Sequence, residues 1–126
     1  MRKSTVLIID DEAFILDELR EAFEDEDYIV LTALNGDEAR AIAEVNRIDL
    51  LITDLKMPRL DGIALYRQLK ELAGFSAPAI LLSGHGAHSN KVDALEAGFA
   101  QCLAKPVDLD ALLHSAGEIC ARPMGS

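Results

Sequence analysis

The sequence predicts one α/β domain in which five parallel strands form the middle layer of a three-layer, doubly wound (βα)5 sandwich. Five short apolar runs alternate with amphipathic stretches along the 126 residues. Three of these runs are nearly continuous, which is typical of strands covered by helices on both faces. Strand–helix alternation with short connections indicates parallel strands and right-handed crossovers. The domain is expected to span residues 1–122, followed by a C-terminal tail, residues 123–126, which is either a frayed end or an expression remnant.

The expected strands are short, mainly apolar runs. They are Thr5 to Ile9, Ile29 to Ala33, Asp49 to Thr53, Ala79 to Leu82, and Gln101 to Ala104. The first, third and fourth are the nearly continuous ones. Between them, apolar residues recur at helical spacing. The expected helices run from Phe14 to Phe23, from Asn35 onward, from Ile63 to Leu72, from Asn90 to Ala97, and from Asp108 to Arg122. Asn35 and Asp108 are suited to cap helix starts, and Gly98 to end the fourth helix.

The net charge of −10 is concentrated in the first half of the chain. Residues 1–61 carry 16 acidic and 7 basic side chains, and the remaining residues carry 6 and 5. An acidic chain is a poor direct ligand for nucleic-acid phosphates, so we expect no direct nucleic-acid partner. Most of the acidic run from Glu24 to Asp27 is interpreted as solvated surface.

Membrane and secretion signals are missing from the sequence. No apolar run approaches the ~20 residues that a membrane-spanning helix needs, and the first residues lack a signal-peptide pattern. Cys102 and Cys120 do not form a CxxC pair, which favours reduced thiols over a disulfide framework. We therefore expect a cytoplasmic protein without a membrane partner.

Polar residues follow four of the predicted strands. They are Asp10, Asp11 and Glu12 after the first strand, Asp54 after the third, Ser83 after the fourth and Lys105 after the fifth. In a parallel sheet these ends share one edge, where open α/β sheets bind ligands. Crowded carboxylates repel one another and need cations; Lys105 offsets one charge and a hard divalent cation can offset the rest. Mg²⁺ suits this edge, because it prefers oxygen ligands and often binds a few carboxylates together with a phosphate oxygen.

This edge is suited to phosphoryl transfer, which needs an in-line nucleophile and positive charge or hydrogen-bond donors at the equatorial oxygens. Asp54 is the best candidate nucleophile, because it stands alone at the end of the central strand and carboxylates can form acyl-phosphates. Mg²⁺, the Lys105 ammonium and the Ser83 hydroxyl could each hold a phosphoryl oxygen.

From Val6 to about Ala121 the chain resembles the response-regulator receiver domains of two-component signalling systems. The resemblance rests on motifs in a fixed order: Asp10-Asp11, Asp54 to Gly62, Ser83-Gly84, Ala97-Gly98 and Lys105-Pro106. Each motif is weak alone, but the complete series is specific. The resemblance implies a flavodoxin-like fold with strand order 2-1-3-4-5, for which a chemotaxis receiver is a standard example.

The resemblance implies that Asp54 is a phosphoacceptor. It would take a phosphoryl group from the phosphohistidine of a histidine kinase or a histidine phosphotransfer protein. Mg²⁺ would be bound by Asp10, Asp11, Asp54 and the backbone carbonyl of Lys56. The domain would be a signalling phosphoacceptor with slow autodephosphorylation, not an enzyme, and it would switch contacts with a downstream protein target or a fused output domain.

The resemblance also implies roles on the fourth and fifth strands. Ser83 and Lys105 would contact phosphoryl oxygens, and the Lys105-Pro106 peptide is expected to be cis, which is common only before proline. Cys102 departs from the family, which usually has an aromatic residue there that turns inward on switching. Coupling to the face of the fourth helix, fifth strand and fifth helix would then use other side chains, and Phe99 is one aromatic nearby.

Two further expectations concern the rim of the site. His85 and Lys56 are hypothesised to tune hydrolysis of the phosphorylated state. Phe14, just after the acidic cluster, either packs into the core or is an exposed contact for the phosphohistidine partner.

Two other function classes stay open. Phosphohydrolases and phosphomutases also use an aspartyl nucleophile on an α/β sheet, but their second Asp, two residues on, is replaced here by Lys56. A receiver-like binding module that is never phosphorylated is disfavoured by the complete set of site residues. Because the chain leaves no room for an output domain, we expect either a stand-alone receiver or a piece of a larger regulator or hybrid kinase.

Overall fold

The computed structural model describes residues 3–84 and 87–121, so the expected tail at residues 123–126 lies outside the described residues. The described chain alternates strands and helices in the predicted (βα)5 order. The strands are β1 (Thr5–Ile9), β2 (Ile29–Ala33), β3 (Leu50–Asp54), β4 (Ala79–Ser83) and β5 (Gln101–Ala104). The helices are α1 (Ala13–Asp25), α2 (Gly36–Val45), α3 (Gly62–Leu69), α4 (Ala87–Ala97) and α5 (Leu109–Cys120).

The strands form one parallel sheet in the order β2-β1-β3-β4-β5, which confirms the expected fold class. The register brings the strand ends level. Ile9 pairs with Thr53, Asp54 with Leu82, and Ser83 with Ala104. The residues that follow β1, β3, β4 and β5 therefore meet at a single edge of the sheet.

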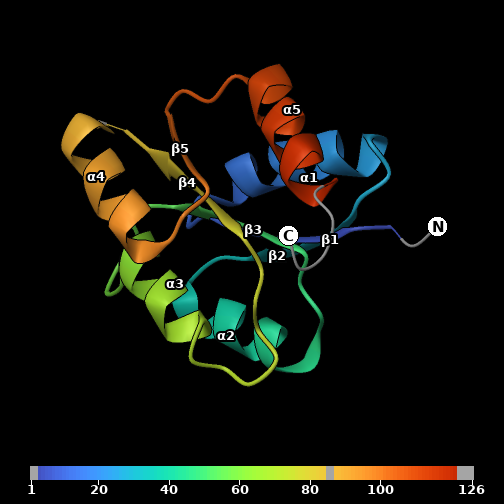
Figure 1. Cartoon of the computed structure of the whole chain (residues 1–126). Helices are drawn as coiled ribbons and strands as arrows, with labels where there is room; N and C mark the ends of the chain where they lie inside the picture. Colours follow the sequence, from blue (N-terminus) through green and yellow to red (C-terminus); the bar gives the residue numbers. More distant parts are fainter. Residues whose placement is uncertain (1–2, 85–86, 122–126) are drawn as a thin grey trace.

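Helices cover both faces of the sheet, with α1 and α5 on one face and α2, α3 and α4 on the other (Figure 1). Because strand side chains alternate between faces, the core is divided into two clusters. Leu7, Leu51 and Leu81 point into the first cluster, and Ile8, Ile52 and Ile80 into the second. Each such side chain contributes about 1.5–3 kcal/mol when fully buried, so packing on both faces stabilises the central strands.

Sequence patterns in the strands agree with their places in the sheet. Every residue of β1, β3 and β4 is buried, and these strands are the three nearly continuous apolar runs. The outer strands β2 and β5 are partly exposed, because each has a neighbour on one side only.

Some element bounds differ from the predicted ones. Asp49 precedes β3 instead of starting it, and its carboxylate accepts a hydrogen bond from the Thr5 amide at 2.8 Å. Helix α3 ends at Leu69 and not at Leu72, which lies in the turn leading to Gly74, whose φ is +83°. The predicted caps are confirmed: Asn35 accepts from the Glu38 amide, Asp108 accepts from two amides, and α4 is followed by a glycine with φ +100°.

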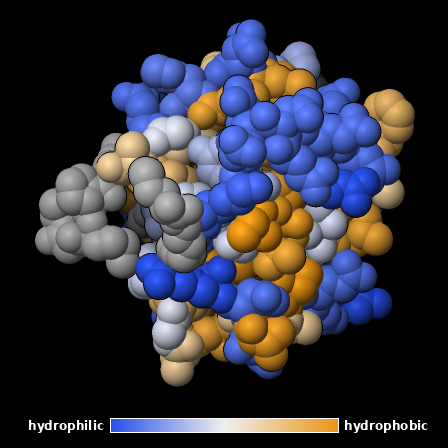
Figure 2. Space-filling view, turned by 90° about the vertical axis from the view of Figure 1, so that its right-hand side faces the viewer, coloured by the Kyte–Doolittle hydropathy of each residue, from blue (hydrophilic) through white to orange (hydrophobic). Residues whose placement is uncertain are grey.

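The surface combines charged residues with a few exposed apolar ones. Figure 2, seen from the side away from α4, shows hydrophobic residues in a band bordered by hydrophilic ones. The large apolar side chains exposed among the described residues are Phe14, Ile29, Leu34, Val45, Val92 and Leu95. No helix in residues 3–84 and 87–121 is both long enough and apolar enough to cross a bilayer.

Candidate functional site

A lysine and two buried carboxylates from different strands meet at the carboxyl edge of the sheet. Lys105 Nζ lies 2.9 Å from Asp54 Oδ1 and 3.5 Å from Asp10 Oδ2. Asp10 is 1% exposed and Asp54 is 6% exposed. These residues follow β1, β3 and β5 or end them, so the parallel strand order is what gathers them.

The backbone directly after Asp54 is held by hydrogen bonds to β4 and to the start of α3. The Leu55 amide donates to the Leu82 carbonyl at 2.9 Å, and the Gly62 amide donates to the Leu55 carbonyl at 2.8 Å. A Cβ on Gly62 would lie 2.3 Å from the Asp54 carbonyl oxygen, which is far inside van der Waals contact. Glycine at position 62 thus allows α3 to begin directly against the backbone of the candidate nucleophile.

The Asp10 carboxylate accepts a hydrogen bond within its own turn and lies in an environment that disfavours its charged form. Its Oδ1 accepts a hydrogen bond from the Glu12 amide at 2.9 Å. Burial raises the pKa of Asp10 above its usual value, the charge of Asp54 raises it further, and the Glu12 amide and Lys105 oppose the rise. The ionised form of Asp10 is therefore only partly compensated and would be stabilised by a further cation.

Lys105 balances two opposing effects. Burial alone would lower its pKa, but the hydrogen bond to Asp54 and the charges of Asp10 and Asp54 outweigh burial, so the pKa of Lys105 is raised. The ammonium is thus held in its charged form between the two carboxylates.

The oxygen atoms at this edge fit a hard cation. Asp10, Asp11 and Glu12 each offer one carboxylate oxygen, and these atoms all lie within 4.8 Å of one another. Asp10 is buried whereas Asp11 and Glu12 are exposed, so a cation there would keep contact with water, as Mg²⁺ prefers. Glu12 was not among the predicted ligands, although its place directly after the acidic pair was a usable signal.

Of the other two predicted ligands, Asp54 shares the Lys105 ammonium with Asp10. Lys56 is exposed in the loop after β3. The ligand role of the Lys56 carbonyl stays a prediction.

Ser83 and Lys105 come from neighbouring strands. Ser83 is fully buried at the end of β4, and its carbonyl accepts a hydrogen bond from the Lys105 amide at 2.7 Å. The Lys105-Pro106 peptide is cis, as predicted. A hollow of about 460 Å³ opens here, lined by Glu12, Ile15, Gly84, Lys105 and Pro106.

The positions that depart from the family pattern have defined surroundings. Cys102 is partly buried beside the first core cluster, and burial raises the pKa of its thiol. Phe99 is 3% exposed, with its ring centroid 4.6 Å from that of Tyr66, so it is part of the core. Phe14 is 80% exposed, which excludes packing in the core. Its other predicted role, as an exposed contact for a phosphohistidine partner, stays a prediction. His85 lies outside the described residues.

Comparisons with known proteins agree on one family. The model of the response regulator receiver domain matches residues 6–116. An uncharacterized 14.6 kDa protein of Leptolyngbya boryana is 36% identical over 116 residues, which are 91% of this chain and 88% of that protein. The transcriptional regulatory protein ResD of Bacillus subtilis is 39% identical over 104 residues, 82% of this chain but 42% of ResD.

A solved structure gives the same result. The receiver domain of a Francisella response regulator superimposes with a TM-score of 0.86 at 30% identity, covering 94% of this chain and 97% of that one. The chain therefore belongs to the family of response regulator receiver domains.

Proposed function

We propose that Asp54 accepts a phosphoryl group from the phosphohistidine of a histidine kinase or a histidine phosphotransfer protein. The observation that carries the proposal is Lys105 Nζ, placed 2.9 Å from Asp54 and 3.5 Å from Asp10 at a carboxylate-rich edge. A nucleophilic carboxylate with an adjacent fixed cation is what transfer of a negatively charged phosphoryl group requires.

The transfer step is a displacement at phosphorus. A carboxylate oxygen of Asp54 forms a bond to phosphorus while the phosphorus–nitrogen bond of the phosphohistidine breaks, and the imidazole keeps the bonding electron pair. Lys105 already donates to Asp54, and it is close enough to donate to an oxygen of the incoming group. The Ser83 hydroxyl, one strand away, is proposed to hold another oxygen.

Asp10, Asp11, Asp54 and the Lys56 carbonyl are proposed to hold Mg²⁺, with Glu12 as an additional nearby carboxylate. When bound, Mg²⁺ supplies positive charge that offsets repulsion between the phosphoryl group and the carboxylates. The buried Asp10, whose pKa is raised by burial, supports this assignment because its charge needs a second cation besides Lys105.

The phosphorylated state is proposed to switch contacts with a downstream protein target or a fused output domain in the cytoplasm. A phosphoryl group on Asp54 adds negative charge, which changes the electrostatic interactions at the sheet edge shared by β1, β3, β4 and β5. We regard this as self-catalysed signalling chemistry with slow autodephosphorylation, not as enzymatic turnover. The net charge of −10 argues against direct nucleic-acid binding.

The test is labelling with acetyl phosphate and Mg²⁺, read as base-labile phosphate by intact-mass measurement. The parent protein should gain one phosphate, and Asp54→Asn should gain none. Asp108→Asn is the matched control, because asparagine caps a helix as well as aspartate does. Equal labelling of Asp54→Asn and parent, or an unlabelled parent, would overturn the proposal. Turnover of a small phosphomonoester would instead support a phosphohydrolase.

A further inference from the structure

Arg59 has a backbone conformation that a bulky side chain disfavours. Its φ is +72°, and the Leu60 amide donates to the Pro58 carbonyl at 2.8 Å, so Arg59 is the central residue of a γ-turn. A γ-turn with positive φ at its centre is rare and strained, and glycine would adopt it without strain. Residues with strained backbone conformations are concentrated at functional sites. The positive φ of Arg59 therefore makes this position a candidate for a functional role.

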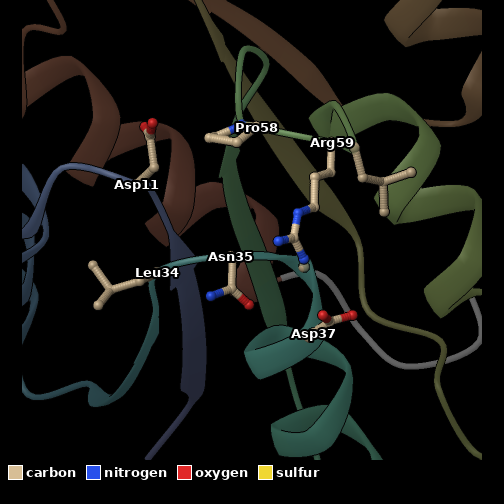
Figure 3. Close-up of a pocket in the computed structure, with 8 residues that line it drawn as sticks. Asp11, Leu34, Asn35, Asp37, Pro58 and Arg59 are labelled. Carbon is tan, nitrogen blue, oxygen red and sulfur yellow. The ribbon is translucent and has the colours of Figure 1, made fainter.

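The Arg59 side chain extends into a cavity of about 320 Å³ between the loop after β2 and the loop after β3. Figure 3 shows its guanidinium pointing toward Asn35 and Asp37. The two loops are in close contact, since a Cβ on Gly36 would lie 3.3 Å from Leu60 Cδ2. Among the residues that the structure describes, none forms an ion pair or hydrogen bond with the guanidinium. The Arg59 side chain is exposed, and no contact with a described residue neutralises its positive charge.

The same cavity is lined by Asp11, which belongs to the carboxylate group of the metal-binding edge. Arg59 and Asp11 therefore line the same cavity. Charges interact across such a space over a Debye length of about 8 Å at physiological salt. An unpaired cation there attracts anions to the edge and opposes the binding of cations.

We propose that the charge of Arg59 attracts the anionic phosphodonor toward Asp54 and weakens Mg²⁺ binding at the Asp10–Asp11 edge. The inference rests on the proposed phosphoacceptor function. It assigns opposite effects to one side chain, and this separates it from a purely structural role. Loss of packing would weaken phosphorylation and Mg²⁺ binding together, whereas loss of charge would weaken one and strengthen the other.

Two variants test the effect of charge directly: one removes a positive charge from the cavity and the other removes a negative charge. Arg59→Gln should lower the second-order rate of phosphorylation by acetyl phosphate about two- to fivefold at low salt and raise Mg²⁺ affinity by a similar factor. Asp37→Asn removes a negative charge from the same cavity wall, so both effects should reverse. Arg59→Lys should behave like the parent. For Arg59→Gln and Asp37→Asn, the changes in phosphorylation rate and in Mg²⁺ affinity should nearly vanish at about 0.5 M salt, where the Debye length is shorter.

The measurements are Mg²⁺ titration calorimetry without phosphodonor, and phosphorylation rates by intact mass at saturating Mg²⁺ and two ionic strengths. Arg59→Gly is the folding control: it removes the charge but suits the turn, so it should match Arg59→Gln in both readouts and unfold no earlier than the parent. Changes of the same sign in both readouts, no change, or effects independent of salt would overturn the inference. An unlabelled parent would instead overturn the phosphoacceptor function itself.

Discussion

Replacing Lys105 with methionine measures how strongly one ammonium compensates two buried carboxylates. For separations of 2.9 Å to Asp54 and 3.5 Å to Asp10, Coulomb's law at an effective dielectric constant of ~20 gives gross attractions of about 6 and about 5 kcal/mol. The net effect is smaller, because methionine needs no desolvation and the remaining carboxylates can bind a proton.

Removing one partner of a buried ion pair generally costs about 3–5 kcal/mol. The Lys105 side chain is 24% exposed, so we expect the lower end, about 3 kcal/mol at neutral pH without divalent cations. The loss should shrink as the pH is lowered, because burial raises the pKa of Asp10 and its protonated carboxyl group needs no compensating cation.

The assay is urea unfolding in EDTA at neutral and acidic pH, repeated with Mg²⁺. Mg²⁺ should stabilise Lys105→Met more than the parent, because the variant edge carries more uncompensated negative charge. Lys91→Met on α4 is the control; it replaces an exposed lysine and should change stability by less than about 0.5 kcal/mol. Equal stabilities of Lys105→Met and parent at neutral pH in EDTA would refute the electrostatic reasoning.

Three further predictions follow from the structure. Gly62→Ala brings a Cβ to 2.3 Å from the Asp54 carbonyl oxygen and should lower unfolding free energy by more than about 2 kcal/mol, whereas Gly84→Ala, with nothing within 4 Å, should be neutral in the same urea titration. The folded pKa of Lys105 is raised above 10.5, so its stabilisation is complete below that pH and is lost as pH rises through the folded pKa; alkaline titration of stability should show this loss in the parent and not in Lys105→Met. Phe14→Ala removes a side chain that is 80% exposed and should leave stability within about 0.5 kcal/mol while slowing transfer from a phosphohistidine partner; unchanged transfer kinetics would argue against a docking role.

The central strands could be predicted because burial determines their composition. Strands β1, β3 and β4 lie between neighbours and under helices on both faces, so every position is apolar or tightly packed. Periodicity does not reveal which strands are neighbours, however. The order that places Asp54 beside Lys105 and Asp10 came from the family resemblance, and the sheet confirms it.

The loops were harder to predict, since their conformation depends on distant contacts. Nothing about Arg59 itself indicates a positive φ; its turn forms where the loop after β3 packs against Gly36. The clustering of Glu12 with the acidic pair depends on the turn in which its amide binds Asp10. The end of α3 at Leu69 likewise follows from the turn at Gly74.

The most direct test of the central claim is to locate the phosphoryl group. After incubation with acetyl phosphate and Mg²⁺, borohydride reduction converts an aspartyl phosphate to homoserine, which peptide mass spectrometry can assign to one position. We predict homoserine at position 54, and its loss in EDTA, because Asp54 is the carboxylate at the end of β3 that contacts Lys105. Homoserine at another aspartate, or labelling that is independent of Mg²⁺, would contradict it.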